Sequence, residues 1–331
     1  MRNSRIVLVS VLAVAGLALS GCSANTADNA DAGADTAVDG AYEVYALLPQ
    51  GNDQPYGTNY LIAMKAAAAD MGVNLTITNA EYDSAKQANE CSVAIASKPD
   101  GIILWPAAVD TITPCLVAAK TAGIPVNASN SDVLPADKSL IGTYTGPSND
   151  GVGRAAADLI GEVLGADGGD IIIVQGLSGN STAIDREAGF RAQLEEKYPN
   201  VKVIGQQPGD WAKDVALTVT SEMLTSLGAE NIDAIYAVDD TMAAGAIEAM
   251  ENRGIDPTTI PVVGTGNTEL GQPNVLSGKQ YATLFQSPVW DGENAVKYIV
   301  EAIKGNALEA NYFMPVPAIT KDNAADYPAE W

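Results

Sequence analysis

The stretch IYAVDDTMAAGAIEAM, residues 235–250, joins an apolar run to two adjacent aspartates and then to small and apolar residues at helical spacing. A short apolar run followed by a 3.6-residue period predicts one β-strand leading into one helix. The stripe that this helix is expected to bury consists of Ala243, Ile247 and Met250. Asp239 and Asp240, at the junction, are a catalytic or metal-binding pair, a ligand-binding group beside a helix cap, or ordinary loop polarity.

The same strand–helix unit recurs from Tyr42 onward, and the pattern starts again near residue 170. The expected strands are 42–48, 73–78, 100–105, 124–129 and 139–144, then 170–176, 201–206, 233–238, 260–266 and 281–286. The expected helices are 58–71, 83–97, 110–122, 183–198, 213–227, 240–253 and 289–304. Such βαβ repetition predicts an α/β fold of two doubly wound, parallel-sheet domains facing each other. The last helix and the β-like run 313–319 are expected to return the chain to the first domain.

Composition excludes several classes of function. The 331 residues include 41 Asp and Glu against 18 Lys and Arg, a net charge of −23, which repels nucleic acid. No histidine is present, so Ser-His-Asp and Cys-His catalysis are excluded. Apolar residues make up 47% of the chain, enough for a sizeable core. About 290 residues remain after the leader described next, which fits two domains.

Residues 1–21 have the pattern of a signal peptide: Arg2 and Arg5 precede an apolar core that is too short for a confident membrane span. The following LSGC resembles the bacterial lipobox, in which Cys22 is lipidated and becomes the mature N-terminus. The alternative is a plain secretory peptide with a chance cysteine. Residues 22–41 are acidic and read as a flexible linker. We therefore expect an extracytoplasmic protein that contacts the membrane only through a lipid anchor.

The two remaining cysteines, Cys91 and Cys115, form a disulfide or stay as two buried thiols. They fall on the second and third expected helices, which usually lie side by side on one face of a doubly wound sheet. That placement favours the disulfide. Two sulfurs supply at most half of a metal site, so no metal is expected.

Three short motifs resemble cofactor or nucleophile signatures but lack their context. GVGRAA, residues 151–156, fits a dinucleotide fingerprint, yet no clean strand leads into it. GTG at 264–266 has no third glycine and is interpreted as a tight turn at a strand end. GLSGN at 176–180 lacks the second flanking glycine of a nucleophile elbow, and no histidine is present to act as base. No cofactor is expected.

Polar and aromatic residues follow the strands, where open α/β sheets bind ligands. Amides, one Arg, one Asp and aromatic rings suit a neutral polyhydroxylated ligand. Each residue alone is more often a loop or cap residue, so the prediction depends on their convergence. These candidates are Gln50, Gln54, Tyr56, Trp105, Asn130, Arg186, Trp211, Asp239, Asn267 and Gln286.

A family resemblance runs through residues 42–315. It is carried, in order, by QPYGTNYLIAMKAAAADMG, KPDGIILWPA, AGIPVNASNS, SND at 148–150, STAIDREAGF, QPGDW, AVDDTMAAGA, VVGTGN and GKQYATLFQ. Together these segments resemble the ribose-binding-protein-like sugar-binding proteins of ABC importers, within the type I periplasmic binding proteins. The resemblance implies a monomeric clamshell that delivers a small ligand to a permease with its ATPase.

The resemblance also implies lobes and contacts. The lobes would be 42–147 plus 287–314 and 148–286 plus 315–331, joined by hinge crossings near 146–148, 286–288 and 314–317. Ligand contacts carried over are Gln50, Gln54, Tyr56, Asn130, Asn149, Arg186, Trp211, Asp239 and Gln286.

The chain departs from ribose-binding members of this family at several positions. Asn130 and Ser131 stand where those members have an Asp-Arg pair, and Gly266 stands where they have an Asp. Tyr56-Gly57 replaces the usual two aromatics. These departures argue against ribose itself and favour another neutral sugar or a linear polyol.

Two other functions share these features. A sensory protein that presents its ligand to a membrane receptor has the same fold. A carbohydrate-acting enzyme would need a carboxylate pair, but Asp239 and Asp240 are adjacent on an extended segment and point in opposite directions. A transcription repressor is excluded by the lipobox and by the missing basic helix-turn-helix. We expect Asp239 to accept from a ligand hydroxyl and Asp240 to serve as N-cap or first-turn charge.

Overall fold

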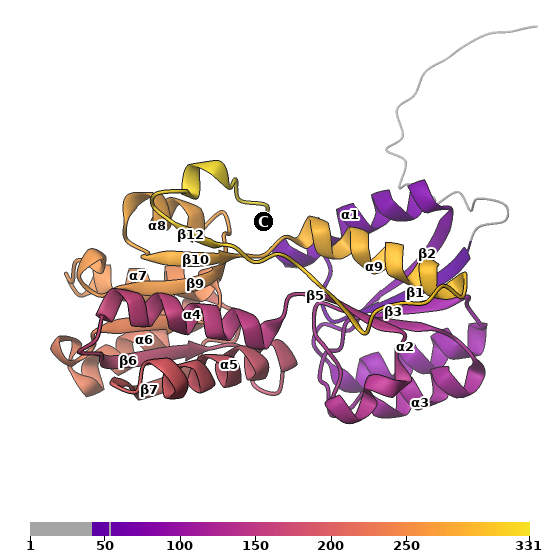
Figure 1. The fold of residues 1–331 in the computed structure, drawn as a ribbon, viewed down its shortest axis with the longest axis horizontal. Coiled ribbons are helices and arrows are strands. Elements are labelled where there is room, and N and C mark those ends of the chain that lie inside the picture. The colour runs from indigo at the N-terminus through magenta and orange to yellow at the C-terminus, as the bar shows by residue number, and fades with distance from the viewer. Residues whose placement is uncertain (1–41, 53) are drawn as a thin grey trace, which may run out of the picture. The chain divides into compact units, whose positions relative to one another are not determined.

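A computed structural model of the protein describes residues 42–52 and 54–331. The predicted leader, the lipidation site Cys22 and the linker 22–41 lie outside these residues. The described chain forms two sheets, each flanked by its own helices, so the predicted α/β fold is confirmed (Figure 1). Of the described helices, none combines the length and apolarity that a membrane crossing requires.

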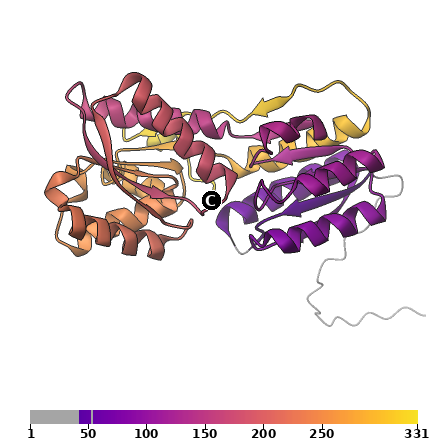
Figure 2. The same ribbon diagram turned by 90° about the horizontal axis from the view of Figure 1, so that it is seen from below.

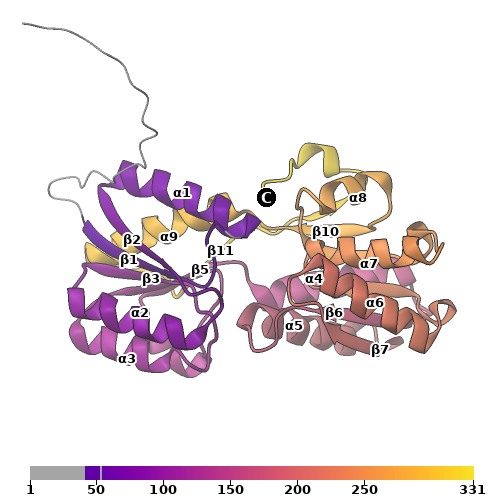
Figure 3. The same ribbon diagram turned by 180° about the vertical axis from the view of Figure 1, so that it is seen from behind.

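The first sheet is entirely parallel and has the order β11-β5-β4-β3-β1-β2. Its strands are β1 (Tyr42–Leu48), β2 (Val73–Asn79), β3 (Gly101–Leu104), β4 (Val126–Ser129), β5 (Thr143–Gly146) and β11 (Asn311–Phe313). One face is covered by α1 (Pro55–Met71) and α9 (Pro288–Ile303), and the other by α2 (Ser84–Ser97) and α3 (Thr113–Ala122) (Figures 1 and 3). Both faces are buried, which explains the apolar runs in its central strands.

The second sheet has the order β12-β10-β9-β8-β6-β7, with only β12 antiparallel to its neighbour among its described pairings. Its strands are β6 (Gly169–Gln175), β7 (Val201–Pro208), β8 (Ala234–Ala237), β9 (Val262–Gly266), β10 (Ala282–Phe285) and β12 (Ala318–Thr320). Its helices are α4 (Asn149–Leu164), α5 (Ser181–Lys197), α6 (Lys213–Leu227), α7 (Asp240–Asn252) and α8 (Gly271–Ser277). Helices α4 and α5 pack together on one face, and α6 and α7 on the other; Figure 2 shows both sheets from below.

The strand orders define where a ligand site is expected. In each sheet the order reverses between the first and third strands in sequence, β1 and β3 in one and β6 and β8 in the other. Ligands bind outside the carboxyl ends of the strands at such a switch point. The chain passes between the sheets after β5, after β10 and between β11 and β12.

Prolines lie at three of the differences from the predicted elements. The first helix begins at Pro55 rather than residue 58, because the fixed φ of proline suits the first helical position. The predicted bounds of the strand 139–144 are wrong. A 3₁₀ helix covers Pro135–Leu140, and the strand runs from Thr143 to Gly146. The β-like run 313–319 is split into β11 and β12 because Pro315 and Pro317 cannot donate to a sheet.

The motifs that were set aside lie within regular structure. GVGRAA lies inside α4, which begins with the Ser148 hydroxyl accepting from the Gly151 N–H. GTG at 264–266 is the end of strand β9, so its interpretation as a tight turn is wrong. A disulfide joins Cys91 on α2 to Cys115 on α3, with the two Cα atoms 6.0 Å apart, in agreement with the prediction.

Candidate functional site

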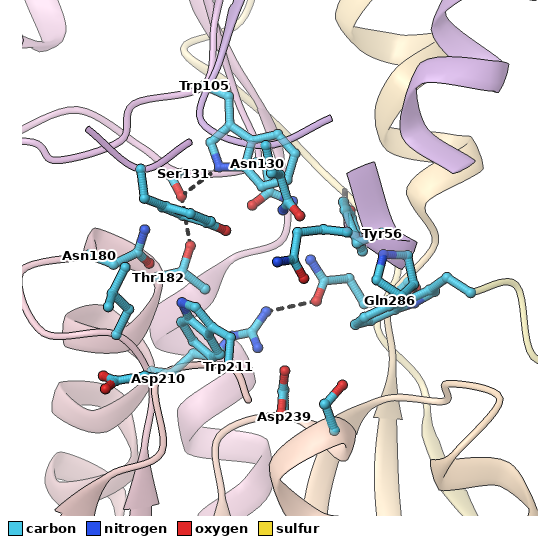
Figure 4. Close-up of a pocket in the computed structure, with 18 of the residues that line it drawn as sticks. Tyr56, Trp105, Asn130, Ser131, Asn180, Thr182, Asp210, Trp211, Asp239 and Gln286 are labelled. Atoms are coloured by element: carbon cyan, nitrogen blue, oxygen red, sulfur yellow. Dashed lines mark hydrogen bonds between the residues drawn. The ribbon is translucent and has the colours of Figure 1, made fainter. Parts of the chain in front are cut away.

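A cavity of about 340 Å³ lies at the carboxyl ends of strands from both sheets (Figure 4). Most of the predicted ligand contacts line it: Gln50, Gln54, Tyr56, Trp105, Asn130, Arg186, Trp211, Asp239 and Gln286. They come from segments that directly follow β1, β3, β4, β7, β8 and β10 or from the start of α5. Parallel strands in the same sheet end at the same edge, so residues distant in sequence meet here.

The two other predicted contacts, Asn149 and Asn267, do not line the cavity. Asn149 lies behind it, accepting from Arg186 Nε at 3.1 Å and donating to the Asn130 carbonyl at 3.3 Å. Asn267 is fully buried and donates to the Tyr327 carbonyl at 2.9 Å. Both asparagines therefore hold other parts of the chain in place, the first around the cavity and the second at the segment 321–331.

Further lining residues were missed in the sequence. They are Pro55, Tyr82, Ser131, Leu177, Asn180, Thr182, Asp210, Thr241, Leu270 and Trp331. Most are neighbours of predicted contacts or lie in the same strand-end loops, so widening each loop by a few residues would have found them. Trp331 is different, because no strand-end pattern precedes it in the sequence.

Hydrogen bonds to three other residues fix the guanidinium of Arg186 in the cavity lining. Arg186 is 2% exposed, and it donates from Nη1 to the Val238 carbonyl at 3.0 Å and from Nη2 to Gln286 Oε1 at 2.8 Å. Burial lowers the pKa of Arg186, yet a guanidinium stays charged at neutral pH. In the part of the chain that the structure describes, it is the one Lys or Arg that lines the cavity. The side-chain oxygen of Gln286 is thereby engaged by Arg186.

Asp239 both caps a helix and lines the cavity. Its carboxylate accepts from the Met242 N–H at 2.7 Å, and its extended backbone makes it the N-cap of α7. The side chain is 7% exposed, and burial raises its pKa to about 7. The predicted N-cap role of Asp240 is therefore wrong, because the helix begins at Asp240 itself, one residue earlier than that role requires.

Asp240 instead joins the start of α7 to the segments around β9 and β10 of the second sheet. Its fully buried carboxylate accepts from the Thr283 hydroxyl at 2.8 Å, from Gln280 Nε2 at 2.7 Å and from the Thr268 N–H at 3.2 Å. A Cβ at Gly264 would lie 2.1 Å from its Oδ1, so strand β9 has a glycine where the carboxylate packs. The two aspartates therefore serve different sites, although Asp240 does lie in the first turn, as expected.

Aromatic rings form one wall of the cavity. The Tyr56 ring meets Trp105 edge to face at 5.7 Å and Trp331 at 5.0 Å between centroids. The Trp105 indole donates to the Ser131 hydroxyl at 3.2 Å, and the Trp331 indole donates to the Gln286 carbonyl at 3.1 Å. With both indole N–H groups engaged, the rings present their apolar surfaces, which suit the C–H faces of a sugar.

One buried carboxylate behind this wall was missed altogether. Asp291, in the first turn of α9, is fully buried and accepts from the Tyr56 hydroxyl at 2.8 Å and from Asn130 Nδ2 at 2.7 Å. Burial raises its pKa to about 7. Only the return of the chain to the first sheet brings it near the cavity, and no local sequence pattern announces that contact.

The raised pKa values of Asp239 and Asp291 predict how stability changes with pH. Both ionise near pH 7 when folded but near 3.8 in their ordinary state, so the unfolded chain loses these protons first. Their contribution to the free energy of unfolding is fully present below about pH 4 and is lost as the pH rises through about 7. Urea denaturation at several pH values measures the free energy of unfolding of wild type and of Asp291→Asn. The stability advantage of wild type over the variant should fall between about pH 5 and about pH 8. A difference independent of pH would contradict the raised pKa of Asp291.

Comparison with known proteins places the chain in a family. In doubly wound sheets, a polar and aromatic cavity at the strand ends is the place where a ligand is expected to bind. The chain belongs to the periplasmic binding protein domain family, whose sequence model matches residues 45–307.

Individual relatives span most of the chain. The xylitol-binding protein of Mycolicibacterium smegmatis is 28% identical over 322 residues, covering 97% of this chain and 87% of the relative. The ribose import binding protein of Haemophilus influenzae is 26% identical over 281 residues, covering 85% and 92%. A solved structure, the binding component of a Shewanella arabinose ABC transporter bound to L-arabinofuranose, is 27% identical with a TM-score of 0.79, covering 86% of this chain and 93% of that one.

Proposed function

We propose that this chain is the solute-binding component of an ABC importer, and that it captures a neutral sugar or polyol in the cavity. The observation that carries the proposal is the lining itself: amides, aromatic rings, a single buried arginine and a buried aspartate converge at the strand ends of both sheets. Each of these groups pairs with hydroxyls or packs on C–H faces. Among the described lining residues the charged side chains are Arg186, Asp210 and Asp239, of mixed sign, so they form no cluster matched to a strongly charged solute.

In this proposal, the two lobes inferred from the sequence close on the ligand. Asn130 and Tyr56 belong to the first sheet and its helices, whereas Arg186 and Asp239 belong to the second. A solute that contacts both sets favours the closed state through those additional contacts. Delivery to a membrane permease is part of the proposal, and it is supported by the family and by a relative that is named as an import binding protein. Anchoring through lipidated Cys22 is part of the same proposal.

An enzymatic role is not proposed. The relatives are named as binding proteins, and the adjacent carboxylates do not share a reaction site. Asp239 lines the cavity, whereas the oxygens of Asp240 are engaged by Thr283, Gln280 and Thr268. Asp239 and Asp240 therefore do not provide two carboxyl groups facing one substrate bond.

Isothermal titration calorimetry with the full chain tests the proposal. The probes are xylitol, D-allose, L-arabinose, myo-inositol and D-ribose, with glutamate and inorganic phosphate as charged controls. We expect saturable one-to-one binding of at least one neutral probe, with a Kd of about 1 µM or lower. D-ribose should bind more weakly than the best probe. Absence of heat with all neutral probes, or preferential binding of a charged control, would overturn the proposal.

A further inference from the structure

The buried carboxylate of Asp291 lies behind Tyr56 and Asn130, two residues that line the cavity. Its helix approaches α1 closely, since a Cβ at Gly292 would lie 2.4 Å from the Tyr60 carbonyl oxygen. The Ser287 hydroxyl caps that helix by accepting from the Trp290 N–H at 3.0 Å. Among the described residues, no Lys or Arg forms an ion pair with Asp291. A carboxylate so buried and unpaired is costly, so its hydrogen bonds call for an explanation.

One oxygen of Asp291 serves the cavity wall. Oδ2 accepts from both the Tyr56 hydroxyl and Asn130 Nδ2. The other oxygen, Oδ1, faces the Ser129 hydroxyl at 3.3 Å, which is in turn 2.8 Å from the Tyr60 hydroxyl. Hydroxyl groups can reverse their direction, so a proton on Oδ1 is accommodated by Ser129 and Tyr60. Oδ2 therefore remains an acceptor whether Asp291 is ionised or neutral.

This contact decides which atom of Asn130 faces the cavity. The backbone of Asn130 is already fixed: its φ is 60°, its N–H donates to the Thr145 carbonyl at 2.9 Å, and its carbonyl accepts from the Tyr144 hydroxyl at 2.8 Å. Only the orientation of the side-chain amide is left to be set. Since Nδ2 is bound to Asp291, Oδ1 is the atom available to a ligand.

We propose that Asp291 is a positioning residue that makes Asn130 a hydrogen-bond acceptor toward the ligand and holds the Tyr56 ring against Trp105. This inference rests on the proposed function for its ligand and names one feature of that ligand, a hydroxyl able to donate to Asn130. Asn130 directly follows β4, and α9 supplies the carboxylate from behind.

Two variants separate positioning from mere burial. Asp291→Asn keeps an oxygen for Tyr56 and Asn130 and can donate to Ser129, so it mimics the neutral carboxyl. Asp291→Leu has similar bulk but no acceptor, which frees the Asn130 amide to turn. The full chain is titrated calorimetrically with xylitol, D-allose, L-arabinose and myo-inositol, each tested singly. We expect Asp291→Asn to stay within about threefold of wild type and Asp291→Leu to weaken the bound probe at least tenfold. The control Asp137→Asn, a buried carboxylate bonded to the Thr113 hydroxyl, should bind like wild type.

A readout without ligand keeps the two proposals apart. In NMR spectra of the isotope-labelled full chain, wild type should show a coupling across the hydrogen bond between Asn130 Nδ2 and the Asp291 carboxyl carbon. The Asn130 amide signal should stay in place in Asp291→Asn and move in Asp291→Leu. Equal affinities in wild type and Asp291→Leu, or the absence of that coupling in wild type, would overturn the positioning role. Failure of wild type to bind any probe would overturn the proposed function, while the coupling would still decide on Asp291.

Discussion

Replacing Asp240 by alanine is expected to lower the free energy of unfolding by about 3 kcal/mol. The variant would leave the Thr283 hydroxyl, the Gln280 amide and the Thr268 N–H without their shared acceptor in a fully buried site. Burial raises the pKa of Asp240, so removing the charge offsets part of this loss. The net effect still exceeds the roughly 0.5–2 kcal/mol of a lost N-cap, because three donors lose their shared acceptor at once.

Urea denaturation of wild type and variant measures this difference. Asp150→Ala is the matched control, since Asp150 is also a first-turn aspartate but is exposed and pairs with Arg154 at 2.9 Å on the surface. Surface pairs of this kind contribute about 0.5 kcal/mol. A loss for Asp240→Ala no larger than that of Asp150→Ala would mean that the carboxylate does not organise the buried site.

Replacing Arg186 by alanine is expected to weaken binding of the best neutral probe about 100-fold or more. The guanidinium is buried, charged and directed toward the cavity, and hydrogen bonds from charged groups contribute about 1.5–3 kcal/mol each. The variant also releases Gln286 and the Val238 carbonyl, both of which the arginine holds. Arg186→Lys keeps the charge but cannot bond three partners in one plane. Its affinity for the probe should therefore lie between those of wild type and Arg186→Ala.

Arg191→Ala provides the control for this prediction. Arg191 lies on the same helix, five residues along the chain, and pairs with Glu187 at 2.8 Å away from the cavity lining. Its removal should leave the calorimetric Kd unchanged. An affinity in Arg186→Ala equal to that in Arg191→Ala would exclude the buried arginine as a ligand contact.

The sequence predicted the strand ends well because burial in a parallel sheet leaves a strong local pattern. Trp105, Asn130 and Gln286 each follow an apolar run closely, and all three line the cavity. The roles of Asp239 and Asp240 were harder to assign. Cap and first-turn positions differ by one residue, and local patterns do not place helix ends to that accuracy.

Asp291 and Trp331 could not be predicted for a different reason. Each reaches the cavity through contacts with residues far away in the chain: Asp291 with Tyr56 and Asn130, and Trp331 with Gln286 and Tyr56. Local periodicity carries no information about such contacts. They follow from the way α9 and the segment after β12 return to sites formed much earlier in the sequence.

The aromatic wall gives the protein an optical property of its own. The chain has four tryptophans, and three of them, Trp105, Trp211 and Trp331, line the cavity at the strand ends. Indole emission depends on the polarity and mobility of the surroundings, so a solute that displaces water from the rings would change the ultraviolet fluorescence of the whole molecule. Trp290 on α9 would remain as a nearly constant background. Occupancy could then be followed in the native chain, without a dye or a label.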